Sequence, residues 1–216
     1  MPWSSCAPRE PMATTVPPEE ALPGRHPEPP TDLNQRSLPI VATHAPWFRI
    51  HQSNYAPLFF GRTGRYRFDA PAGEFGILYA GNDEYCAFIE TFGHSLDSRV
   101  VTMDELKRRD LARLVVNRPL RLVDLTGAGL ARLGADNRVC TGDYLLAQRW
   151  ALALWRHADQ PDGLSYRSRL DPSRQCVALF DRAQEAIIAS SLGSLADARH
   201  RRLLASLLDM YGIGLL

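Results

Sequence analysis

A glutamate lies at the edge of the apolar face of a predicted helix. The segment 82–93 reads NDEYCAFIETFG, in which Asn82 is a suitable N-cap and Gly93 a suitable stop. The buried stripe of this helix consists of Tyr85, Phe88, Ile89 and Phe92. Glu90 lies about 100° around the helix from Ile89, at the edge of that stripe. Two interpretations of Glu90 stay open, a solvated surface residue or a catalytic carboxylate.

Two arginines lie among apolar residues in predicted strands. Arg49 alternates with apolar neighbours in FRIH, and Arg67 stands between aromatic residues in YRFD. An arginine with buried neighbours needs an anionic partner. That partner is either a structural Asp or Glu, or a bound phosphate gripped by the guanidinium fork. A tyrosine, Tyr79, lies in the otherwise apolar segment ILYA.

A serine near the end of another predicted strand is a further candidate. Ser168, in LSYRSRL, shares a face with Tyr166 and Leu170. Taken alone, such a serine is usually a hydroxyl with a local hydrogen-bond partner. Ser165 lies three residues earlier, so the segment offers two hydroxyls.

The composition is that of an ordinary globular protein. Of the 216 residues, 45% are hydrophobic and 23% charged, which excludes a collagen, a coiled coil and a wholly disordered chain. The 25 Lys+Arg against 24 Asp+Glu provide no overall positive field, so we do not expect nucleic acid as a partner. The basic run 199–202 is the remaining candidate for that role, and such a run is usually a solvated helix face.

The sequence shows no sign of a metal site or a membrane span. The cysteines, Cys6, Cys86, Cys140 and Cys176, lack zinc-ligand spacing, and Cys86 and Cys176 are interpreted as small buried thiols. No run of about 18 apolar residues occurs, and the N-terminus does not have the order of a secretion signal. We therefore expect a cytoplasmic protein with no metal.

The elements that must position these residues begin after a proline-rich leader. Ten of the 16 prolines fall in residues 1–39, so we expect residues 1–37 to be disordered or extended and residues 38–216 to form the folded domain. Apolar or alternating runs predict strands at 47–51, 65–69, 76–81, 120–126, 164–169, 176–181 and 186–190. Helical patterns cover 83–92, 103–109, 143–157 and 196–211, and the aromatic residues of 143–157 are assigned to the core.

This order of elements predicts the fold class. The first three predicted strands precede any helix, and later elements do not alternate regularly. We therefore expect an α+β fold with mixed, mostly antiparallel β-sheets and flanking helices, rather than a doubly wound parallel sheet.

The order and spacing of these motifs resemble the RES domain family, which is named for an Arg, a Glu and a Ser. The motifs, spread over about residues 38–190, are FRIH, YRFDAP, GILYAG, AFIETFG, LRLVDLTG, DGLSYRSR and VALFDR. The resemblance implies that Glu90, Arg49 and Ser168 are catalytic. It also implies that NAD+ is bound by Arg49, Arg67, Tyr79 and Ser168. The family commonly shows GRFN where this chain has YRFD, so Asp69 replaces an amide.

The resemblance also implies a fold similar to ADP-ribosyltransferase toxins and a role as the toxin of a bacterial type II toxin–antitoxin pair. NAD+ would then be the substrate rather than a cofactor, and an antitoxin protein would be the partner. The acceptor stays open. Water makes the enzyme a glycohydrolase, inorganic phosphate makes it a phosphorylase, and a protein side chain makes it an ADP-ribosyltransferase.

The residue types suit cleavage of the nicotinamide–ribose bond. The leaving group begins as a cationic pyridinium and departs neutral, so no general acid is needed. What must be stabilised is the oxocarbenium-like ribose, and an ionised Glu90 could do so. Arg49 and Arg67 would hold the pyrophosphate. The competing class is a non-enzymatic nucleotide- or partner-binding module, in which the same arginines pair with Glu90 and Asp69 in the core.

Overall fold

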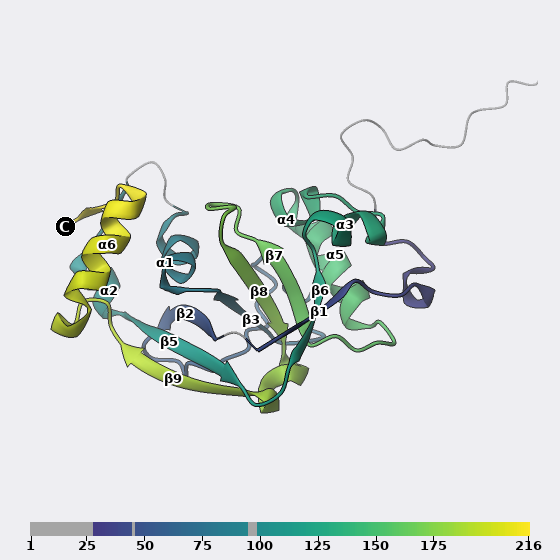
Figure 1. Ribbon diagram of the computed structural model, residues 1–216, viewed down its shortest axis with the longest axis horizontal. Coiled ribbons are helices and arrows are strands. Elements are labelled where there is room, and N and C mark those ends of the chain that lie inside the picture. Colours follow the sequence, from purple (N-terminus) through teal and green to yellow (C-terminus); the bar gives the residue numbers. More distant parts are fainter. Residues whose placement is uncertain (1–27, 45, 95–98) are drawn as a thin grey trace, which may run out of the picture.

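A curved, eight-stranded sheet forms the centre of the fold (Figure 1). The computed structural model describes residues 28–44, 46–94 and 99–216. The strand order is β1-β6-β7-β8-β3-β2-β5-β9, and every neighbouring pair is antiparallel except β6–β7, which is parallel. The strands of this sheet are β1 (Ile40–Thr43), β2 (Trp47–Gln52), β3 (Ile77–Gly81), β5 (Arg109–Val116), β6 (Leu120–Asp124), β7 (Gly163–Arg167), β8 (Gln175–Phe180) and β9 (Ile187–Gly193). A separate parallel pair joins β4 (Val100–Val101) to β10 (Gly214–Leu215).

Helices cover the two ends of the sheet (Figure 1). One end carries α3 (Gly127–Leu133), α4 (Arg138–Thr141) and α5 (Tyr144–Trp155), and the other carries α1 (Glu84–Phe92), α2 (Met103–Lys107) and α6 (Arg201–Tyr211). Short 3-10 helices are η1 (Leu33–Gln35), η2 (Asp181–Ala186) and η3 (Ala198–His200). This arrangement confirms the expected α+β class with a mixed, mostly antiparallel sheet. Within the described ranges, no helix has the length and apolar character needed to cross a bilayer.

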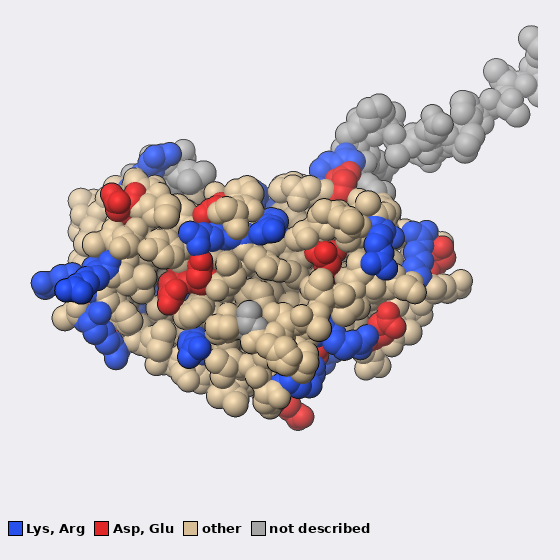
Figure 2. Space-filling view, in the orientation of Figure 1, with Lys and Arg blue, Asp and Glu red and all other residues tan. Residues whose placement is uncertain are grey.

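The core is divided between the two ends and the middle of the sheet. At one end, Trp150 of α5 is fully buried in a cluster with Phe75 and Phe180. At the other, Phe88 of α1 packs with Leu207 of α6. The apolar stripes that predicted these helices are thus the faces that they bury. Basic and acidic side chains form several small groups on the face shown in Figure 2.

The segment 65–69, predicted as a strand, is instead a tight turn. Asp69 Oδ2 accepts hydrogen bonds from the backbone N–H groups of Arg65 (3.1 Å) and Tyr66 (3.2 Å), and from the Thr63 hydroxyl (2.8 Å). The Asp69 N–H donates to the Tyr66 carbonyl (3.1 Å). Because the carboxylate binds the N–H groups that a strand would offer to its neighbour, the segment folds back on itself. The strand prediction was therefore wrong here.

The predicted start of α1 is wrong by one residue. The N-cap is Asp83 rather than Asn82, because the Asp83 side chain accepts a hydrogen bond from the Cys86 N–H (2.8 Å). Either residue type caps a helix well, so composition alone could not choose between them. The C-terminal end of the helix is as expected, with Gly93 at the C-cap.

One long strand of the sheet, next to its edge, was missed. The predicted helix 103–109 ends at Lys107, and Arg109 begins β5, which lies between β2 and β9. The charged residues at the start of β5, Arg109 and Asp110, mask the apolar alternation that follows. The strand β1 and the helices α3 and α4 were also missed, and the predicted helix 196–211 forms an α-helix only from Arg201.

Part of the predicted leader packs on the domain. Leu33 is buried, and the His157 Nε2 atom lies 3.1 Å from the Leu33 carbonyl oxygen and 3.0 Å from that of Arg36. The packed chain therefore begins before Leu38. The expectation of a disordered or extended segment concerns mainly residues 1–27, which lie outside the described residues.

Candidate active site

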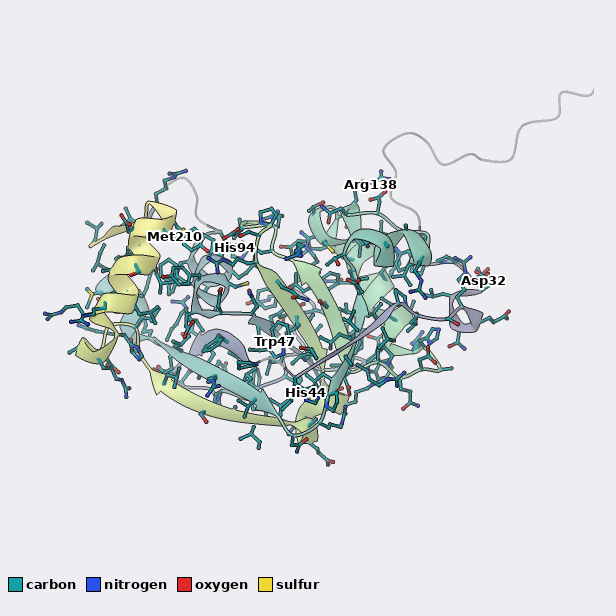
Figure 3. All side chains as sticks on the ribbon, viewed as in Figure 1. Asp32, His44, Trp47, His94, Arg138 and Met210 are labelled. Carbon is teal, nitrogen blue, oxygen red and sulfur yellow. The ribbon has the colours of Figure 1, made fainter. Side chains whose placement is uncertain are left out.

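Four of the five candidate residues line one cavity of about 610 Å³. These are Arg49, Arg67, Tyr79 and Glu90, which come from β2, the turn 65–69, β3 and α1. The volume falls within the roughly 300–1,000 Å³ of small-molecule sites. His94, labelled in Figure 3 just beyond α1, also lines this cavity.

Ser168, the fifth candidate, holds Glu90 from behind the cavity. The Ser168 hydroxyl lies 2.5 Å from Glu90 Oε1, and Ser168 is buried, with 1% of its surface exposed. Its oxygen also accepts hydrogen bonds from the N–H groups of Leu170 (3.1 Å) and Asp171 (2.9 Å). Since those two donors occupy both lone pairs, the hydroxyl proton is directed to Glu90. Ser168 therefore positions the carboxylate rather than facing the cavity.

The same geometry distinguishes the two serines of the segment. Ser165 lies within β7, and its hydroxyl oxygen accepts a hydrogen bond from Gln175 Nε2 (2.6 Å). Ser168 lies just after the end of β7, where its hydroxyl closes a turn onto Leu170 and Asp171. Only Ser168, of the two, contacts Glu90.

Arg49 occupies the gap where β2 diverges from β3. Phe48 and Gly81 form the pair joining the two strands, and Gly61 bridges to Ile77 further along β3. Arg49 Nη1 donates to the carbonyl oxygens of Pro57 (3.3 Å) and Phe59 (3.2 Å), in the segment that runs beside the gap. The hydrogen bonds thus fix the guanidinium at the wall of the cavity.

The charge of Arg49 is not neutralised by the part of the protein that the structure describes. No carboxylate there forms an ion pair with it, and its buried Nε has no hydrogen-bond partner. Burial lowers the pKa of Arg49 to about 10. The group is still charged at neutral pH, so a half-buried cation faces the cavity without an anion.

Arg67 has a different environment but also has no acidic partner among the described residues. Its Nη1 donates to the Gly142 carbonyl (2.7 Å), just before α5, and its guanidinium lies 4.5 Å from the centroid of the Tyr144 ring. Neither Glu90 nor Asp69 pairs with Arg67 or Arg49. The core ion pairs expected for a non-enzymatic binding module are therefore not formed between these residues.

The hydroxyl of Tyr79 forms two hydrogen bonds within the protein. It donates to Asp69 Oδ1 (3.0 Å) and accepts a hydrogen bond from the Phe68 N–H (3.0 Å). Burial, reinforced by the negative charge of Asp69, raises the pKa of Tyr79 well above its usual range. A ligand would therefore meet mainly the aromatic face of Tyr79. Asp69, where the family commonly has an amide, serves as the acceptor that fixes this tyrosine.

Two cysteines confirm the prediction of small buried thiols. Cys86 and Cys176 are 0% and 2% exposed, and their sulfur atoms lie 3.4 Å apart between α1 and β8. The hydrogen bond between them and burial raise the pKa of Cys176 strongly. Cys176 is therefore a poor nucleophile, and both buried thiols pack beneath the helix that carries Glu90.

The sequence did not identify several of the residues that line the cavity. Tyr144 was assigned to the core, but it stands in the first turn of α5, is 39% exposed and covers Arg67. Tyr55 and Phe59 line the cavity from a segment without apolar periodicity, so no sequence signal marked them. His51, which also lines the cavity, was noted only as a neighbour of Arg49.

Known proteins are similar to this chain in sequence and in structure. The model of the RES domain family matches residues 46–203. A curated relative from Sinorhizobium fredii (strain NBRC 101917 / NGR234), named "Probable toxin y4kH", is 34% identical over 110 residues, which cover 50% of this chain and 84% of the relative. A chain of the M. tuberculosis MbcT–MbcA toxin–antitoxin complex is similar in structure, with a TM-score of 0.60 and 16% identity over 82% of this chain and 98% of that one. The structural likeness shows that the two chains share a fold.

Proposed function

Because the chain belongs to the RES domain family, we propose that it is the toxin of a bacterial type II toxin–antitoxin pair and that it breaks down NAD+ in the cytoplasm. Two relatives support the toxin role, since one is named a probable toxin and the other comes from a toxin–antitoxin complex. One arrangement of side chains is the main support for breakdown of NAD+. Glu90, oriented by Ser168, shares a cavity with two arginines that have no carboxylate partner among the described residues.

Glu90 is placed to stabilise the reacting ribose. When the nicotinamide–ribose bond breaks, its electron pair moves to the pyridinium nitrogen, nicotinamide leaves neutral, and positive charge develops on the ribose. Ser168 engages Oε1 of Glu90, while no side chain or N–H group of the described residues engages Oε2. That oxygen is available to the ribose. A preorganised carboxylate of this kind is usually among the largest contributions to catalysis.

The two arginines supply positive charge for the phosphates of a dinucleotide. NAD+ carries two phosphates, and a guanidinium group binds phosphate oxygens through paired hydrogen bonds. Arg49 is fixed by two backbone carbonyls, and Arg67 by the Gly142 carbonyl and the Tyr144 ring. Both groups are thus held in place before the ligand arrives, which reduces the entropy lost on binding.

We assign the acceptor to water or inorganic phosphate. The cavity has the volume of a small-molecule site, and the part of the chain that the structure describes adds no docking module for a protein substrate to the compact domain. Water yields ADP-ribose, and phosphate yields a phosphorylated ADP-ribose. A protein ADP-ribosyltransferase is the alternative, and it would leave ADP-ribose attached to protein.

Nicotinamide release from NAD+ tests the proposal. The wild-type protein should release nicotinamide, and Glu90→Gln should reduce the rate by about a hundredfold or more. Glu185→Gln is the matched control, because Glu185 is exposed in η2 and does not line the cavity. Products formed with and without phosphate then identify the acceptor. A folded wild-type protein that releases no nicotinamide would exclude the enzymatic function.

A further inference from the structure

A stacked pair of aromatic rings lies exposed at the cavity. Tyr55 and Phe59 have ring centroids 4.9 Å apart with an interplanar angle of 26°, yet they are 50% and 46% exposed. The neighbours of Phe59, Leu58 and Phe60, turn inward and pack against the buried cluster that contains Leu78. Phe59 therefore points away from the core between two residues that point into it. Packing of the domain gives no reason for this orientation.

The pair adjoins the arginine that lacks an anion. Tyr55, Phe59 and Arg49 line the same cavity, and the Arg49 guanidinium donates to the backbone carbonyl of Phe59 itself. His51 also lines this cavity, and burial lowers its pKa. Through the hydrogen bond to Phe59, the guanidinium lies beside the two rings at the wall of the cavity.

Another aromatic pair lines a different part of the cavity. The rings of Tyr66 and Tyr79 meet edge to face, with centroids 6.0 Å apart. The Phe68 N–H donates to the Tyr79 hydroxyl, and the Phe68 ring lies 5.0 Å from the ring of Tyr166. Tyr166 lies two residues before Ser168, whose hydroxyl donates to Glu90. Glu90 therefore lies at the Tyr79 end of the cavity. The cavity contains two aromatic sites, of which one adjoins the carboxylate and the other adjoins Arg49.

We propose that the Tyr55–Phe59 pair stacks the adenine base of the substrate and so makes the site selective for a dinucleotide. This inference rests on the proposed function. NAD+ carries an aromatic ring at each end of its pyrophosphate, so with the nicotinamide end at Glu90 and the phosphates at Arg49, the adenine falls beyond the arginine. Purines stack well on aromatic side chains, because every base has a π-face.

Nicotinamide mononucleotide provides the test, because it has the scissile bond but no adenine. Tyr55→Ala and Phe59→Ala should each raise KM for NAD+ by about tenfold to a hundredfold, the range found for loss of one stacking contact. The ratio of kcat/KM for NAD+ to that for nicotinamide mononucleotide should fall by the same factor. Tyr55→Phe and Phe59→Tyr keep the stack and should keep the ratio. Ile188→Ala, at an exposed residue outside the cavity, is the control for loss of surface apolar area.

Binding of 5′-AMP provides a readout that needs no turnover. The wild-type protein should bind 5′-AMP in a calorimetric titration, and each alanine variant should weaken that binding by a similar factor. Equal losses for both substrates would place nicotinamide on the pair and overturn the proposal. Unchanged kcat/KM ratios together with unchanged binding of 5′-AMP would also overturn it. Contact with a protein partner would then be the better explanation of the exposed Tyr55–Phe59 pair. Failure of the proposed function looks different, since the wild-type protein would then release no nicotinamide from either substrate.

Discussion

The hydrogen bond from Ser168 to Glu90 allows the sharpest test of the active site. Ser168→Ala removes a donor 2.5 Å from the carboxylate and leaves the rest of α1 untouched. A hydrogen bond to a charged group contributes about 1.5–3 kcal/mol. If that energy serves to hold Glu90 against the developing positive charge, kcat should fall by roughly 10- to 150-fold. KM should change little, because Ser168 is buried and the groups assigned to the phosphates are elsewhere.

The same substitution should also affect stability. Without the hydroxyl, the N–H groups of Leu170 and Asp171 lose their acceptor, at a cost of about 1–3 kcal/mol if they stay dry. A fall in Tm alone would therefore not show a role in catalysis. Ser165→Ala is the matched control, because Ser165 is equally buried, three residues away, and its hydroxyl bonds to Gln175 instead of Glu90.

The assay is nicotinamide release as a function of NAD+ concentration, with thermal unfolding of each variant alongside. We expect Ser168→Ala and Ser165→Ala to lower Tm by similar amounts and only Ser168→Ala to lower kcat. Ser168→Thr keeps a hydroxyl and should recover much of the loss. Equal kcat values for the two alanine variants would refute the positioning role of Ser168.

Two further predictions concern charge. Arg49→Met keeps the aliphatic stem and removes a charge that burial disfavours, so we expect Tm to stay the same or rise while KM for NAD+ increases at least tenfold. A marked loss of Tm would show instead that the hydrogen bonds to Pro57 and Phe59 make Arg49 a structural residue. Burial opposes ionisation of Asp162, but hydrogen bonds from Arg118 and from the Arg121 N–H outweigh it and hold the pKa of Asp162 below its usual 3.8. The stability from this lowered pKa is present above about pH 4 and is lost as the pH falls further, so Asp162→Asn should be less stable at pH 7 and lose less stability between pH 5 and pH 3, as measured by urea unfolding.

Local patterns predicted the helices better than the chain segments between them. Apolar residues recur every three or four positions in α1 and α5, so a short stretch of sequence is enough to predict each helix. The turn at 65–69 was misread because its structure depends on where one carboxylate points rather than on periodicity. The strand β5 was missed because its place in the sheet depends on β2 and β9, which lie far from each other in sequence.

The sequence alone determined the chemical types of the site and the face of α1 on which Glu90 lies. It also supplied the order of motifs that implies the family. It could not choose between a structural and a ligand-binding role for the arginines, because that choice depends on which carboxylates come near them in space. The tertiary structure places Ser168, 78 residues away, on Glu90 and turns Asp69 to Tyr79, and neither carboxylate forms an ion pair with Arg49 or Arg67. Such pairings depend on how distant strands and turns come together in the sheet, and no local pattern in the chain records that.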